Sequence, residues 1–193
     1  MATPDIAGVD RRRRRREQTI DEIVGIAVEV MAQEGVAGLS LSEVARRMGI
    51  QPPSLYKYFP SKLALYDELF KRGAGEVLAA FRAAVALAEP GWAALTAGTE
   101  AIMRWGLDHQ VLGQLLNWRP VPGFAPSAEA FAPCLELVQE IRRLLQAAAG
   151  RRVQLANQPR ASWDQGRFTR LTPQVLQLFR CAYPPQKESR GER

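Results

Sequence analysis

The sequence predicts an all-α fold, on three observations. Apolar residues recur every three or four positions over several long stretches, and glycines and prolines separate these stretches. No segment shows the alternating pattern or the tight-turn pairs of a β-hairpin. The chain has 193 residues, of which 47% are apolar and 24% are charged, so it is long enough to bury a core in one or two small domains.

The first helix is expected to begin at Glu17 and to end at Gly35, which suits a left-handed helix end. Residues 1–14 are predicted to be a flexible basic arm, because they are polar and lead into the arginine run 11–16. The helix has one apolar face, made by Ile20, Ile23, Val24, Ala27, Val30 and Met31.

Two short helices are predicted next. Ser40 and Glu43 have the spacing of a capping box, which would start a helix that Gly49 ends. Pro52 and Pro53 suit the first turn of a second helix over 52–58. The helix-turn-helix is therefore placed at about 40–59, within a DNA-binding domain over 15–75.

The next helix is expected to be capped by Ser61 and to extend toward Pro90, with a kink or boundary at Gly73 and Gly75. A second helical domain is predicted over 76–193. It comprises one or two helices over 92–118, a loop over 119–126, a helix over 135–148 that Gly150 ends, and a short helix over 173–183.

Composition excludes several classes of protein. No apolar run is long enough to cross a bilayer, and no apolar segment follows the arginines as in a secretory signal. Two cysteines cannot form a disulfide framework, which favours a reducing cytoplasmic location. A single histidine, His109, rules out a metal site of several imidazoles, and no phosphate-loop, nucleophile-elbow or zinc-protease motif is present. We therefore expect no metal, no cofactor and no enzymatic activity.

The charge distribution favours a polyanionic partner. The formal net charge is +6, and the six arginines 11–16 lie close to the predicted helix-turn-helix. In such a motif the second helix enters the major groove of DNA, while a cationic arm contacts phosphates. Pro53, Ser54, Tyr56 and Lys57 are expected to face outward from this helix, opposite Leu55 and Phe59.

Three other interpretations are open. The arginine run can be a solvated tail, and Tyr56 and Tyr58 can be partly buried aromatics of a small helical domain. A basic protein that binds membrane surfaces is disfavoured, because Asp21, Glu22 and Glu29 lie on the polar face of the first helix. An enzyme is the third interpretation, and it has no motif to support it.

The stretch 35–69, GVAGLSLSEVARRMGIQPPSLYKYFPSKLALYDEL, resembles the DNA-binding domain of the TetR family of bacterial transcriptional regulators. The resemblance covers about residues 15–72. It implies a homodimeric, ligand-responsive repressor that binds double-stranded DNA at an inverted repeat. It also implies phosphate contacts by Tyr56 and Tyr58, a groove contact by Lys57, a backbone contact by Lys62 and a phosphate near Ser40. Together with the arm and the outward residues, the predicted DNA-binding set is Arg14, Arg15, Arg16, Ser40, Gln51, Pro53, Ser54, Tyr56, Lys57, Tyr58 and Lys62.

The second half is similar to family members with a WHG-type C-terminal domain, through residues 105–109, 119–124 and 166–173. This similarity implies that 76–193 is a regulatory and dimerisation domain, which carries both a pocket for a small apolar effector and the dimer interface. The connector 149–153 is too short for another long helix, so the chain is also predicted to be shortened there, with a weaker dimer or a non-repressing relative as the alternative. The candidate pocket residues are Trp92, Trp105, His109, Leu115, Trp118 and Phe124.

Overall fold

The computed structural model describes residues 6–118 and 120–156. The chain divides into two compact units, Met1–Leu145 and Gln146–Arg193, and the described residues of the second are the last turns of one helix. The described residues are all helical or irregular, which confirms the all-α prediction. They form α1 (Ile6–Glu34), the 3-10 helix η1 (Val36–Gly38), α2 (Leu41–Arg47), α3 (Pro52–Leu55), α4 (Lys62–Leu87), α5 (Trp92–Asp108), α6 (Gln110–Trp118) and α7 (Ala128–Ala156).

Helix α1 corrects the prediction of a flexible arm. It begins at Ile6 rather than at Glu17, so residues 6–14 and the whole arginine run are helical. Arginine is a good helix former, and two ion pairs within the helix offset part of the repulsion among the arginines. Arg13 pairs with Glu17 and Arg14 pairs with Asp10, each at 2.8 Å.

The helix-turn-helix is present, but two of its predicted details are wrong. The Ser40 hydroxyl accepts no hydrogen bond from α2, so the capping box does not form. The Glu43 carboxylate instead accepts from the guanidinium groups of Arg46 and Arg47 at 2.7–2.8 Å. These charge-assisted bonds are stronger than one bond to a neutral backbone N–H.

The second helix is shorter than the predicted 52–58. Helix α3 ends at Leu55, and residues 56–58 form a turn in which Leu55 O accepts from the N–H groups of Tyr58 and Phe59 at 2.9 and 3.0 Å. Pro60 prevents the helix from continuing past Phe59, because a proline disfavours helical backbone at the residue before it. Tyr56 and Lys57 therefore come after the recognition helix instead of lying within it.

Helix α4 is continuous through Gly73 and Gly75, so the expected kink is absent. The prediction that Ser61 caps this helix is confirmed, since its hydroxyl accepts from Ala64 N–H at 3.1 Å. At Gly73 a Cβ atom would lie 2.8 Å from Leu116 Cδ1 of α6. This glycine therefore serves close helix packing, and the predicted boundary at residue 75/76 falls inside α4.

The later helices differ from prediction mainly in length. The stretch 92–118 forms two helices, α5 and α6, and residues 120–127 form a loop. Helix α7 begins at Ala128, contains Pro133 and passes through Gly150, so the predicted helix over 135–148 is too short and 149–153 is no break. An interior glycine costs a helix only about 1 kcal/mol, which a long helix tolerates. The predicted helix over 173–183 and the segment 166–173 lie outside the described residues.

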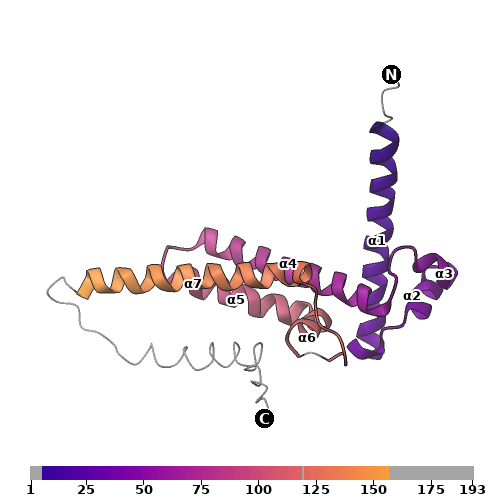
Figure 1. The fold of residues 1–193 in the computed structure, drawn as a ribbon. Helices are drawn as coiled ribbons and strands as arrows, with labels where there is room; N and C mark the ends of the chain where they lie inside the picture. Colours follow the sequence, from indigo (N-terminus) through magenta and orange to yellow (C-terminus); the bar gives the residue numbers. More distant parts are fainter. Residues whose placement is uncertain (1–5, 119, 157–193) are drawn as a thin grey trace, which may run out of the picture. The chain divides into compact units, whose positions relative to one another are not determined.

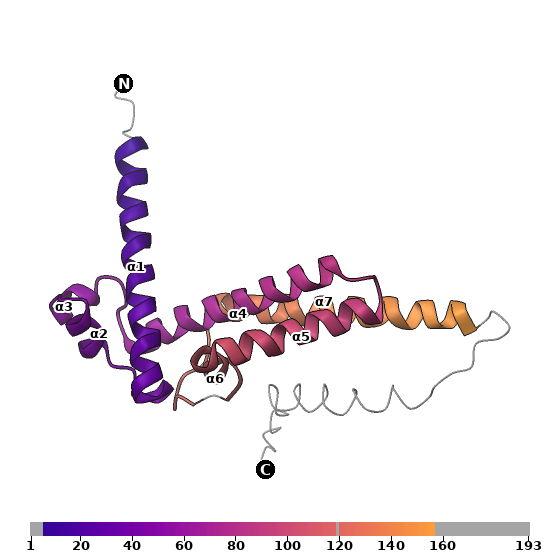
Figure 2. The same ribbon diagram turned by 180° about the vertical axis from the view of Figure 1, so that it is seen from behind.

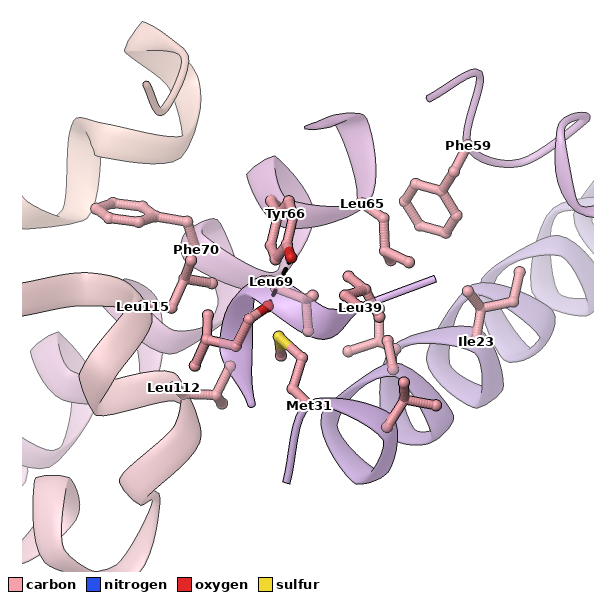
Figure 3. Close-up of a cluster of buried hydrophobic side chains, with 14 of the residues drawn as sticks. Ile23, Met31, Leu39, Phe59, Leu65, Tyr66, Leu69, Phe70, Leu112 and Leu115 are labelled. Carbon is pink, nitrogen blue, oxygen red and sulfur yellow. Dashed lines mark hydrogen bonds between the residues drawn. The ribbon is translucent and has the colours of Figure 1, made fainter. Parts of the chain in front are cut away.

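Helix α4 connects the two halves of the first unit, as Figures 1 and 2 show. Its first turns pack on α1, and its later turns lie beside α5 and α6. Arg82 of α4 also pairs with Glu136 and Glu140 of α7 at 2.6–2.7 Å. A single hydrophobic core therefore runs from the helix-turn-helix into the later helices, with Ile23, Leu65, Leu69, Leu112 and Leu115 among its buried members (Figure 3).

Candidate nucleic-acid interface

The recognition segment presents its polar side chains to solvent. Leu55 and Phe59 are buried in the core, as predicted, while Tyr56 is 52% exposed and Lys57 is exposed. Lys57 has no ion pair with another described residue. Its ammonium group is therefore available to a phosphate or to the guanine edge in the major groove.

A shallow hollow lies next to this segment and brings three predicted residues together. Ser40 precedes α2, Tyr56 comes after α3, and Lys62 begins α4, yet all three line the same hollow. Sequence reasoning missed Ser42 as a lining residue and recognised Ser61 only as a helix cap. Hydroxyl and ammonium groups that converge in this way suit a phosphate oxygen. The remaining lining residues are Leu39, Leu41 and Pro60.

Buried Tyr66 lies beside Lys62, one of the lining residues of this hollow. Its hydroxyl donates a 2.6 Å hydrogen bond to Val36 O, and burial raises the pKa of the phenol. The Lys62 ammonium lies 5.9 Å from the centre of the Tyr66 ring, which favours a cation over the ring face. Lys62 is thereby held beside the hollow at the start of α4.

Other predicted DNA-binding residues lie around α3. Gln51 is the exposed residue before the helix, and its carbonyl oxygen accepts from Ser54 N–H at 2.8 Å. Pro53 is exposed and Ser54 is half-buried. The side chains of Ser40 and Gln51 make no capping hydrogen bond to α2 and α3. Their polar groups are therefore not used in helix capping.

The arginine run meets the helix-turn-helix at one point. The guanidinium carbon of Arg16 lies 5.3 Å from the centre of the Tyr58 ring, in the turn after α3. Arg15 is exposed, and Arg14 is held by Asp10. The structure therefore brings Arg16, but not Arg14, beside the predicted phosphate-binding tyrosine.

Glu43, the acidic residue of α2, does not face a polyanion as an unpaired negative charge. Hydrogen bonds from Arg46 and Arg47 lower the pKa of Glu43 to about 2. Its carboxylate is therefore ionised at neutral pH and carries two cationic partners. Arg47 also donates to the side chain of Gln33 at 2.6 Å, which ties α2 to α1.

The six residues predicted for an effector pocket do not converge on one hollow within the described part of the chain. Trp105 and Leu115 are buried in the core, and Phe124 packs against that core. Trp92 begins α5, about 20 Å along the helix axis from Trp105 at 1.5 Å per residue. The side chain of Trp118 lies outside the described residues.

Trp105 is anchored on two sides. Its indole N–H donates to Glu76 at 3.1 Å, and its ring stacks on His109 with 4.8 Å between ring centres. Phe124 lines a second hollow, between the start of α4 and the loop before α7. The other residues of that hollow are Leu63, Ala64, Asp67, Gly123, Ala125 and Ser127.

Neither a metal site nor a membrane span is found in the described ranges. Within residues 6–118 and 120–156, His, Cys, Asp and Glu side chains form no group of three that could hold a metal ion. Over the same ranges, no helix is both long and apolar enough to cross a membrane.

Residues 23–69 match the family model of bacterial regulatory proteins of the tetR family. This segment includes the buried face of α1, the helix-turn-helix and the first turns of α4. These residues are therefore similar to the DNA-binding domain of the tetR family. The match agrees with the prediction of a regulatory protein in place of an enzyme.

Two regulators of transcription are similar to somewhat more than half of this chain. The chain is 35% identical over 111 residues to the HTH-type transcriptional repressor DrrR1 of Streptomyces coeruleorubidus, which covers 57% of this chain and 39% of the relative. It is 30% identical over 112 residues to the HTH-type transcriptional activator FasR of Mycolicibacterium smegmatis, covering 57% and 51%. The chain thus spans less than two thirds of either relative.

The fold of about two thirds of this chain resembles that of the putative regulatory protein SCO4313, whose crystal structure is known. The TM-score is 0.58 and the identity is 31%, over 64% of this chain and 59% of that one. The specific WHG-type assignment of the C-terminal half stays a prediction, because its motif around 166–173 lies outside the described residues.

Proposed function

We propose that this protein is a DNA-binding regulator of transcription that uses its TetR domain to contact the major groove. The observation that carries the proposal is the arrangement of Ser40, Tyr56 and Lys62 around one hollow, next to exposed Lys57, within a domain of known family. A helix-turn-helix needs such a surface, because phosphate contacts position it and groove contacts give specificity.

Substitution of the recognition segment tests DNA binding. Tyr56→Ala and Lys57→Ala are expected to weaken specific binding by about 1–3 kcal/mol each, the usual worth of a good base or backbone contact. Arg104→Ala on α5 is a matched loss of one exposed positive charge outside the surface, and it should bind like the native protein. The native site is first selected from random duplexes. Unchanged affinity of Tyr56→Ala and Lys57→Ala would refute this placement of the interface.

We further propose repression, at an inverted repeat bound by a homodimer in the cytoplasm. Two half-sites about 34 Å apart are the usual way for a helix-turn-helix to gain specificity. DrrR1 is a repressor and FasR is an activator, so the direction of regulation needs its own measurement. A reporter gene behind the selected site should be less active when the protein is present. Increased activity would make it an activator.

Large apolar side chains that are exposed on helices of the single chain support the homodimer. Met103 and Leu107 of α5 are 64% and 72% exposed, and Leu135 of α7 is 50% exposed. Clusters of large exposed apolar residues often mark protein interfaces. We expect α7 to contribute to the interface, together with the segment 173–183 that lies outside the described residues.

Leu144→Arg is expected to give monomers in sedimentation at micromolar concentration, because an unpaired arginine is costly at a desolvated interface. Leu144 is half-buried within the chain, so Leu135→Arg at an exposed position is the second variant. Both should melt cooperatively. A native dimer that survives both substitutions would place the interface elsewhere.

A small apolar effector completes the proposal, with Trp105, Leu115 and Phe124 as the part of the predicted set that shares one core. Ligands usually bind in mostly apolar pockets with a few polar groups, and Glu76 and His109 are the polar groups beside Trp105. An effector should quench Trp105 fluorescence and change the affinity for the selected site. If a compound changes the DNA affinity of the Trp105→Phe variant but binds away from residue 105, the effector pocket does not lie at Trp105.

A further inference from the structure

The arginine run has two chemically different faces, because α1 is a continuous helix there. Arg12 and Arg16 lie one turn apart, and the same face continues through Ile20 to buried Ile23. Arg14 lies about 200° around the helix from Arg16. All six arginines are exposed, so the helix itself decides which of them can approach a surface together.

The face with Arg12 and Arg16 leads to the recognition segment. Arg16 lies over the ring of Tyr58, directly after Tyr56 and Lys57 in the sequence. Arg12 lies about 6 Å farther along the axis on the same side, at 1.5 Å per residue. Neither Arg12 nor Arg16 has an ion pair with another described residue.

The opposite face is acidic and partly neutralised. Arg14 pairs with Asp10, and the helical repeat continues its face to Asp21, which pairs with Arg72 of α4 at 2.7 Å. Arg11 lies on a neighbouring line that continues to Glu22 and Glu29. A phosphate backbone on this side would meet carboxylates as well as arginines.

The positive face also lacks counter-charge within the described residues. Like charges four residues apart on a helix repel, and Arg12 and Arg16 have this spacing. Only Arg13 and Arg14 have carboxylate partners in the run. Phosphates along Arg12 and Arg16 would supply the missing negative charge.

We propose that Arg12 and Arg16 form a rigid second contact with the DNA backbone, next to the major-groove site, and that Arg11 and Arg14 do not take part. The proposal rests on the proposed DNA-binding function and deepens it. A flexible arm would use all six arginines without regard to face, whereas this helix uses one line of them. The contact reads no bases, since phosphate contacts position a protein without specifying sequence.

The test compares two double variants with the same loss of charge, Arg12→Gln/Arg16→Gln and Arg11→Gln/Arg14→Gln, in the full chain. Glutamine keeps the helix propensity close to that of arginine. Binding to a fluorescent duplex of about 30 base pairs and random sequence is measured at several salt concentrations. Each phosphate contact contributes a slope of about −0.9 in log K against log salt, so the first variant should lose about 2 units of slope and the second should stay near native.

Equal slopes for both variants would overturn the proposal, whether both match the native slope or both fall below it. A folded native protein that binds no duplex at any salt concentration would instead overturn the proposed function. Sedimentation with anionic vesicles in the absence of duplex binding would show that the arginine face serves a membrane surface, which also refutes the proposal. Circular dichroism of each variant confirms that α1 remains helical.

Discussion

The two halves of the first unit bury their apolar residues to different degrees. From Ile23 to Phe70 most large apolar side chains pack into one core, with Leu65, Tyr66 and Leu69 fully buried and with Tyr56 and Leu63 as exposed exceptions. Helices α5 and α7 leave Met103, Leu107 and Leu135 at least half exposed. The first region thus exposes mainly polar side chains. The second region exposes apolar side chains that no other part of the described chain covers. Such surfaces commonly serve association.

Substitution of one leucine by alanine in each region is expected to give the largest difference in stability between the two regions. Leu65→Ala is expected to destabilise the protein by about 2–5 kcal/mol, because it leaves a cavity in a fully buried core. Leu135→Ala removes an exposed side chain and should leave the stability of the monomer within about 0.5 kcal/mol. Urea denaturation at low protein concentration measures both.

The same pair reports on assembly at higher concentration. If α7 lies in a dimer interface, the stability loss of Leu135→Ala should grow with protein concentration, because subunit association stabilises the folded state. Leu65→Ala serves as the control, since its cavity is present in monomer and dimer alike. A concentration-independent loss at Leu135 would remove this residue from the interface.

Glycines of α5 provide a second contrast, with effects of opposite sign. At Gly98 a Cβ atom would clash with the buried Phe81 ring, so Gly98→Ala should destabilise by about 1–3 kcal/mol through overpacking. At Gly106 nothing lies within 4 Å of the added Cβ, so Gly106→Ala should stabilise by up to about 1 kcal/mol through helix propensity. Thermal melts distinguish the two. A stabilising Gly98→Ala would mean that α4 and α5 are not closely packed at this point.

The smallest expected effect concerns the ion pairs of α2. Hydrogen bonds from Arg46 and Arg47 lower the pKa of Glu43 to about 2, from an ordinary value of 4.5. A lowered pKa contributes stability that is fully present above about pH 4.5 and is lost as the pH falls toward 2. Native protein should therefore lose slightly more stability than Glu43→Gln between about pH 5 and pH 2. High salt should reduce the difference, because the group is exposed. Parallel acid titrations would disprove the contribution of this carboxylate.

The sequence by itself determined the helical class and the helix-turn-helix, because both depend on local signals. The spacing of Ile23, Ala27 and Val30, the positive φ of Gly35 and Gly49, and the Ser61 cap all hold in the structure. The predictions that Leu55 and Phe59 point inward and that Tyr56 and Lys57 point outward are confirmed, since four-residue spacing fixes the face of a single turn. The tetR match of residues 23–69 rests on this same local pattern.

Only the tertiary structure decided features that depend on partners distant in sequence. Gly73 has the pattern of a helix breaker, yet the structure packs Leu116 of α6 against it. The arginine run has the composition of a flexible arm, yet α1 extends through it and Arg16 meets Tyr58, which is distant in the sequence. Local sequence patterns determine which backbone conformations have low free energy, whereas long-range contacts select among these conformations. In this chain the arginine run is part of a helix with one face toward the recognition segment, and long-range contacts favour this arrangement.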